Sequence, residues 1–319
     1  MTGAPSPRKP ETAAITIGKP GDFDEFWAET LRQAEAVDPA PELIHRPDLS
    51  TERVTVGELS YTSFGGVRVT SWYAAPAEPA PPGGYPVVLH IPGYISEPAI
   101  MKSWAARGYV AIDLAPRGKL RANAVVNPGF PGLLVDNITD RFSYTYRGFY
   151  VDVVRALDVV ADLPDVDGGR IGVWGSSQGG GLGIISAALR PGLVRCVAAG
   201  APYLCGIMAA TRLTHSYPYE EITEYLRVRP DDEALITETV SYYDGLNFAG
   251  AVRAPILVYL GMEDDVCPPE TGFSVFRLLP EPKTLLTYER CAHHAGLRWV
   301  VPEVEKFLDG FLEPSGAIA

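Results

Sequence analysis

Residues Arg170–Gly181 read RIGVWGSSQGGG. Gly175–Gly179 fits the pattern G-x-S-x-G, in which a strand turns sharply into a helix and leaves the central serine strained and exposed. The flanking positions are glycine because a Cβ there would collide with the neighbouring chain. The alternative is an ordinary glycine-rich turn, of the kind that can bind phosphate. The preceding apolar run and the following small-residue helix favour the first interpretation, with Ser177 rather than Ser176 as candidate nucleophile.

Short apolar runs and helical patterns alternate on both sides of this turn. Such alternation predicts a mostly parallel sheet that helices cover on both faces. The expected strands are Pro86–Ile91, Tyr109–Leu114, Arg170–Val173, Val194–Ala199, Pro255–Leu260 and, more weakly, Thr284–Tyr288. The expected helices between and after them are Arg147–Ala161, Gly179–Leu189 and Pro302–Leu312.

The N-terminal part and one internal stretch depart from this alternation. Residues 1–50 predict a surface strap and an amphipathic helix, Asp22–Ala36, and two alternating runs, Arg53–Ser60 and Val67–Ala74, predict antiparallel edge strands. Residues 202–247 predict only helical pieces, including Tyr219–Leu226 and Asp232–Tyr242, and therefore a helical cap. The whole chain, 1–319, is expected to form a single domain with the α/β-hydrolase fold.

Composition narrows the class of protein. The chain has 319 residues, is 46% hydrophobic and carries a formal net charge of −12. This composition argues against disorder and a transmembrane bundle, and the acidic balance argues against a nucleic-acid surface. The four cysteines form no C-x-x-C pair, and the N-terminus has too short an apolar run for a signal peptide. We therefore expect free thiols and a cytoplasmic protein.

A serine nucleophile needs a base, and the base needs a carboxylate that orients it. In this fold the chain order is Ser, then Asp or Glu, then His. Three carboxylates follow the strand Pro255–Leu260, namely Glu263, Asp264 and Asp265, and periodicity alone does not choose among them. His293 and His294 lie in the last loop before the final helix, in the place where the base is expected.

Two backbone N–H groups are candidates for the oxyanion hole. The N–H of Gln178 lies at the start of the helix that follows Ser177, and the N–H of Tyr94 follows the strand Pro86–Ile91. A simple Pro-Gly turn is the alternative at residues 92–94. The adjacent histidines do not suit a single metal ion, and no Cys, His or carboxylate cluster has ligand spacing. No cofactor and no metal are expected, and His45, His90 and His215 are interpreted as structural.

Four segments resemble the acetyl xylan esterase / cephalosporin C deacetylase family, carbohydrate esterase family 7. They are Lys19–Leu31, Tyr146–Val160, Gly172–Gly181 and Gly261–Pro269, and the resemblance extends from about residue 15 to 312. Its most specific part is the loop Val266–Pro269. The resemblance implies Ser177 as nucleophile, Asp264 as acid, His293 as base, and the main-chain N–H groups of Tyr94 and Gln178 as oxyanion donors. The chain differs from the family pattern at Pro92, Lys119 and His294.

The resemblance implies an esterase that removes acetyl groups from small sugars or cephalosporin-like alcohols, and a homo-oligomer, commonly a hexamer. An acyltransferase or lactone-processing enzyme would use the same nucleophile with another acceptor. A catalytically silent binding protein is a third interpretation, which a complete set of Ser177, Asp264 and His293 argues against. A peptidase is the weakest alternative. The expected partner is a small-molecule ester, without nucleic acid or membrane.

Overall fold

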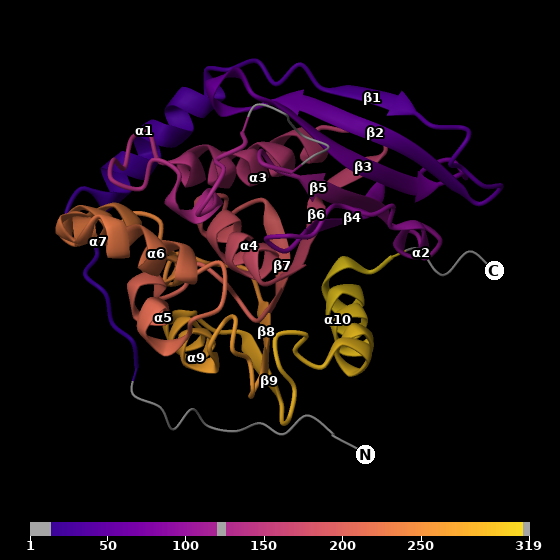
Figure 1. Ribbon diagram of the computed structural model, residues 1–319. Helices are drawn as coiled ribbons and strands as arrows, with labels where there is room; N and C mark the ends of the chain where they lie inside the picture. The colour runs from indigo at the N-terminus through magenta and orange to yellow at the C-terminus, as the bar shows by residue number, and fades with distance from the viewer. Residues whose placement is uncertain (1–13, 120–125, 315–319) are drawn as a thin grey trace.

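The computed structural model describes residues 14–119 and 126–314, which build one nine-stranded sheet flanked by helices (Figure 1). The strand order is β1-β2-β3-β5-β4-β6-β7-β8-β9. The strands are β1 Glu42–His45, β2 Val54–Thr62, β3 Arg68–Pro76, β4 Tyr85–Ile91, β5 Val110–Ala115, β6 Val166–Ser176, β7 Val194–Gly200, β8 Ile256–Gly261 and β9 Lys283–Tyr288. The sheet confirms the predicted alternation of strands and helices.

Strand direction also follows the prediction. Strand β2 pairs antiparallel with both β1 and β3, and β3 pairs antiparallel with β5, whereas β5, β4 and β6–β9 are mutually parallel. The edge strand β1 lies within the segment expected to contain only a strap and a helix, so that expectation was incomplete. Its four residues have no buried face, and an alternating pattern therefore does not arise.

Helix α1 precedes the first strand, α10 follows the last, and the other helices lie in the connections between strands. The helices are α1 Phe23–Glu35, α2 Lys102–Ala105, α3 Thr145–Ala161, α4 Gln178–Leu189, α5 Ile207–Leu213, α6 Glu220–Val228, α7 Glu233–Ser241, α8 Gly245–Ala249, α9 Pro269–Leu278 and α10 Leu297–Leu312, with short 3₁₀ turns η1 Phe64–Gly66, η2 Leu133–Val135 and η3 Pro230–Asp232. The last helix begins five residues before the predicted start at Pro302. Among the described residues, no helix has the length and apolar character that a membrane crossing requires.

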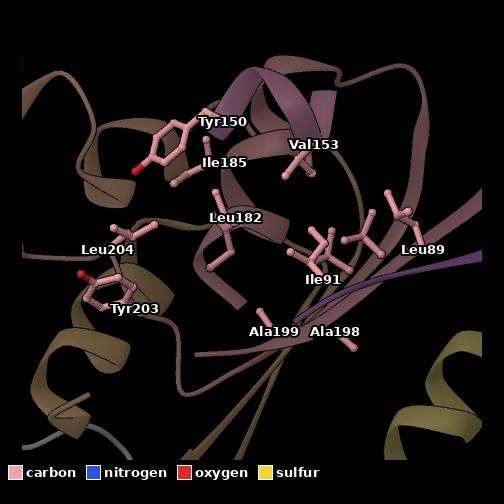
Figure 2. Packing of buried hydrophobic residues seen from close by; sticks show 14 of the residues in the cluster. Leu89, Ile91, Tyr150, Val153, Leu182, Ile185, Ala198, Ala199, Tyr203 and Leu204 are labelled. Carbon is pink, nitrogen blue, oxygen red and sulfur yellow. The ribbon is translucent and has the colours of Figure 1, made fainter. Parts of the chain in front are cut away.

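Helices cover both faces of the sheet, as neighbouring residues of β6 demonstrate. A Cβ on Gly172 would lie 2.7 Å from Leu312 in α10, whereas a Cβ on Gly183 in α4 would lie 3.3 Å from Val173. Successive strand residues point to opposite faces, so α4 and α10 lie on opposite sides. In Figure 2, Leu182 of α4 lies among Val153, Ile91 and other buried apolar residues. Packing in the core therefore fixes the position of α4, and with it the turn between β6 and α4 that contains Ser177.

An aromatic cluster joins α1 to the helices between β7 and β8. The Trp27 ring lies 5.7 Å from Tyr150 in α3, 5.5 Å from Tyr243 and 5.3 Å from Phe248 in α8, measured between ring centroids. The indole N–H of Trp27 donates a 2.8 Å hydrogen bond to the carbonyl of Tyr242. Residues 202–247, all described, contain helices and no strand, as the sequence predicted.

Candidate active site

The turn between β6 and α4 has the shape that its glycines predict. Ser177 has φ 58° and ψ −121°, a backbone conformation that is strained for any residue with a side chain. A Cβ on Gly175 would lie 2.6 Å from the backbone of Gly179, and one on Gly179 would lie 1.8 Å from the carbonyl oxygen of Ile91. Glycine at both positions is therefore a steric requirement of the turn.

Backbone hydrogen bonds hold this strained residue in place. The Ser177 N–H donates to the carbonyl of Gly200 at 2.9 Å, and the Ser177 carbonyl accepts from the N–H groups of Gly181 and Tyr203 at 3.1 and 3.0 Å. The bonds to Gly200 and Tyr203 come from the end of β7 and the segment after it. The surrounding chain therefore stabilises a conformation that Ser177 would not adopt alone.

The loop after β4 lies beside Ser177 because β4 pairs with β6 in a register that places Ile91 opposite Gly175. A Cβ on Gly93 would lie 3.9 Å from the Ser177 Cβ. The N–H groups of Tyr94 and Gln178 have no acceptor among the described residues. Both predicted oxyanion donors are thus free to bind another group near this serine.

The loop after β8 contains three carboxylate side chains, of which one is buried and two are exposed. Asp264 is 6% exposed, whereas Glu263 and Asp265 are exposed. The Nδ1 atom of His293 lies 2.9 and 3.1 Å from the two carboxylate oxygens of Asp264. One of those oxygens also accepts the N–H groups of Val266 and Cys267, each at 2.9 Å. The structure brings together the acid and the base that the resemblance had implied.

Ser177 and His293 do not share a hydrogen bond within the described part of the chain. The Ser177 hydroxyl instead interacts with the Cys267 thiol. Burial and the Asp264 charge raise the pKa of that thiol, and the hydrogen bond from Ser177 opposes the rise. Cys267 follows Asp264 in the same loop, so the loop that carries the carboxylate reaches the serine. His293 is 31% exposed at its side chain, which leaves the ring accessible. His294 is exposed, and the histidine hydrogen bonds to Asp264 in the described structure come from His293 and not from His294.

Sequence reasoning missed a buried acid beside Tyr94. Glu221, in α6, is 2% exposed and accepts a 2.6 Å hydrogen bond from the Tyr94 hydroxyl and a 2.8 Å bond from the Leu134 N–H. The Tyr94 hydroxyl in turn accepts from the Leu133 N–H at 2.8 Å. Burial raises the pKa of Glu221 to about 7. Nothing in the pair Glu220-Glu221 indicates burial, because adjacent acids on a helix usually face solvent.

The remaining histidines lie apart from the Asp264 carboxylate. His90 pairs with Asp113 at 2.7 Å, His215 pairs with Glu220 at 3.2 Å, and His45 is exposed. Within residues 14–119 and 126–314, no group of three His, Cys, Asp or Glu side chains could hold a metal ion.

Comparison with known families matches residues 14–311 to the acetyl xylan esterase family model, AXE1. This match covers almost the entire described chain. The chain belongs to the acetyl xylan esterase family. It is therefore a member of a family of carboxylic ester hydrolases, and the resemblance stated from the sequence is confirmed.

Individual relatives agree with this family assignment. The acetyl esterase Axe7A of Xylanibacter ruminicola is 29% identical over 290 residues, which are 87% of this chain and 64% of that relative. This chain therefore spans just under two thirds of Axe7A. The acetyl xylan esterase from Paenibacillus sp. R4 is 29% identical with a TM-score of 0.87, covering 93% of this chain and 96% of its own.

A second solved structure, acetyl xylan esterase 1 from Thermoanaerobacterium sp. JW/SL YS485, is 26% identical with a TM-score of 0.85. It covers 95% of this chain and 96% of its own. More distant α/β hydrolases, below 20% identity, share the fold alone. The predicted α/β-hydrolase fold is confirmed.

Proposed function

We propose that this chain is a serine esterase that hydrolyses small carboxylic esters, acetyl esters in particular, on sugars or natural-product alcohols. The observation that carries the proposal is the hydrogen bond from the accessible His293 ring to the buried Asp264 carboxylate, in a chain whose strained Ser177 opens α4. Membership of the acetyl xylan esterase family supports the acetyl group as the acyl portion. In this proposal Ser177 is the nucleophile, His293 the base and Asp264 the acid.

The reaction is a two-step acyl transfer to water. Asp264 keeps the proton of His293 on Nδ1, so Nε2 accepts the proton of the Ser177 hydroxyl as its oxygen attacks the ester carbonyl. The N–H groups of Tyr94 and Gln178 stabilise the negative oxygen of the tetrahedral intermediate. His293 then protonates the departing alcohol, and a water molecule, deprotonated by the same ring, releases the carboxylic acid and restores Ser177.

The wider setting of the enzyme is part of the proposal. We treat the chain as one domain, in which residues 202–247 form a cap over the carboxyl edge of the sheet. We propose a homo-oligomer, a hexamer as in the resemblance, and exposed apolar side chains such as Ile44 and Trp299, 53% and 43% exposed, support an interface. Four free, buried cysteines support a cytoplasmic location. Light scattering of the purified protein tests the oligomer.

The test of the esterase proposal is the Ser177→Ala variant, with Ser176→Ala as matched control. S177A should lose essentially all hydrolysis of p-nitrophenyl acetate and all labelling by a fluorophosphonate probe, since both reactions need the Ser177 oxygen. S176A keeps the nucleophile and should keep both activities. Wild-type rates in S177A would refute the assignment of the nucleophile, and an unlabelled, inactive wild-type protein would favour a binding protein.

A further inference from the structure

Lys119 lies beneath the loop that carries one of the two proposed oxyanion donors. It follows Arg117-Gly118 just after β5, and its side chain is buried at 3% exposure. Its ammonium group donates hydrogen bonds to the carbonyl oxygens of Gly93 and Tyr94, each at 2.6 Å. Bonds of this length from a charged donor are among the stronger hydrogen bonds in proteins. One side chain thus holds two successive peptide groups.

The first of these carbonyls shares a peptide plane with the N–H of Tyr94. The Gly93–Tyr94 bond is not among the cis bonds of the chain, so its C=O and N–H point in opposite directions. A hydrogen bond that fixes the carbonyl therefore fixes the direction of the N–H as well. Because the Gly93 carbonyl points at the Lys119 ammonium, the Tyr94 N–H points away from Lys119 within the same plane. The Gly93 position itself lies next to Ser177, since a Cβ there would be 3.9 Å from the Ser177 Cβ.

The charge of Lys119 has a second effect on the same peptide. A cation bound to the carbonyl oxygen draws electron density from the amide and makes its N–H a better hydrogen-bond donor. The Tyr94 side chain is anchored separately, through its hydroxyl, by Glu221 and the Leu133 N–H. The backbone and the side chain of Tyr94 are thus fixed by independent contacts.

We propose that Lys119 is a positioning residue for the oxyanion hole, which orients and polarises the Gly93–Tyr94 peptide so that the Tyr94 N–H stabilises the tetrahedral intermediate. The inference rests on the proposed esterase function. It assigns a role to one of the positions at which this chain differs from the family pattern. Lys119 acts through the peptide and does not touch the ester.

The electrostatic surroundings of Lys119 give the proposal a pH signature. Burial lowers the pKa of Lys119 to about 8, against the opposing effect of Glu97 and Asp113. Asp113 is itself engaged by His90 and by the Ala99 N–H. Below pH 8 the ammonium polarises the peptide, and above it the neutral amine donates hydrogen bonds without the charge. The turnover number should therefore decline as pH rises through about 8.

The test compares K119M and K119Q with an exposed-lysine control, K306M on α10. K119M should lower kcat for p-nitrophenyl acetate by about 10- to 100-fold with KM within about twofold, since losing a whole oxyanion donor costs about 10²–10³-fold. Fluorophosphonate labelling should slow in parallel. K119Q keeps two N–H donors without charge, so it should recover part of kcat and lose the decline near pH 8, whereas K306M should match the wild type.

Three outcomes separate the hypotheses. Hydrolysis at the wild-type rate in S177A would overturn the proposed function itself. Wild-type kcat in K119M, with S177A inactive, would overturn only the role of Lys119. Thermal unfolding shows whether K119M folds. If it does not, the pH profile of K119Q is the test. A decline of kcat near pH 8 in K119Q that is identical to that of the wild type would also overturn the role of Lys119.

Discussion

The Asp264→Asn substitution tests the arrangement of the acid and the base most directly. Asp264 is buried, and one carboxylate oxygen accepts the N–H groups of Val266 and Cys267 while both oxygens face Nδ1 of His293. An asparagine of the same shape would keep its oxygen on the two backbone N–H groups. Its NH₂ would then face His293 and donate to Nδ1.

That reversal places the proton of a neutral His293 on Nε2, where the base must be free to accept one. A tautomer reversal of this kind in a Ser-His-Asp triad lowers kcat by about 10⁴-fold. At about 1.36 kcal/mol for each tenfold change, this corresponds to about 5.4 kcal/mol of lost transition-state stabilisation. The fold should tolerate the change because the backbone hydrogen bonds of the loop are retained.

The assay is steady-state hydrolysis of p-nitrophenyl acetate by D264N and by D265N, with thermal unfolding of both. Asp265 is adjacent in sequence but exposed, so D265N should keep wild-type kcat within a fewfold. A folded D264N with more than a tenth of wild-type kcat would refute the role of Asp264. A larger loss in D265N than in D264N would move the acid to the neighbouring residue.

Two further predictions concern the stability of the protein around the site: one tests packing at Gly179, and the other tests the titration of Glu221. G179A should destabilise the fold by about 1–3 kcal/mol or more in urea denaturation, because its Cβ would lie 1.8 Å from the Ile91 carbonyl oxygen. The control G310A, with open space around its Cβ, should stabilise α10 by about 0.5–1 kcal/mol, and equal effects would contradict the steric argument. Burial raises the pKa of Glu221 from 4.5 to about 7. Between these two pH values the folded protein holds a proton on Glu221 that the unfolded chain releases. The free energy of unfolding of the wild type should therefore fall as the pH rises from about 4.5 to about 7. E221Q should lack this fall when unfolded in urea at about pH 5 and about pH 8, and an identical fall in the variant would show that another group titrates.

The fold was predictable wherever a local requirement leaves a mark in the sequence. The glycines around Ser177 are such a mark, because the turn excludes a Cβ at Gly175 and Gly179. Buried parallel strands are another, since they need continuous apolar runs. The start of α10 was not predictable, because proline favours the first turn of a helix and Pro302 instead lies inside it.

The sequence predicted which types of residue form the site, but it did not predict most of the contacts between them. Three neighbouring carboxylates were equivalent in the sequence, and only burial and the bond to His293 distinguish Asp264. Lys119 was visible as a departure from the family pattern, but its contacts join residues 25 and 26 positions apart. Glu221 lies 127 positions from Tyr94, and no local pattern records a contact over such a distance.

The aromatic cluster around Trp27 sets an order in which parts of the protein can fold during synthesis. Trp27 is made early, whereas its hydrogen-bond acceptor Tyr242 follows 215 residues later. Ribosomes add about 5–20 residues per second, so Tyr242 is synthesised about 10–40 s after Trp27. During this interval Trp27 can already pack against Tyr150 of α3, but the part of its ring surface that contacts Tyr243 and Phe248 stays uncovered. The docking of α1 is therefore complete only after residues 242–248 have been synthesised.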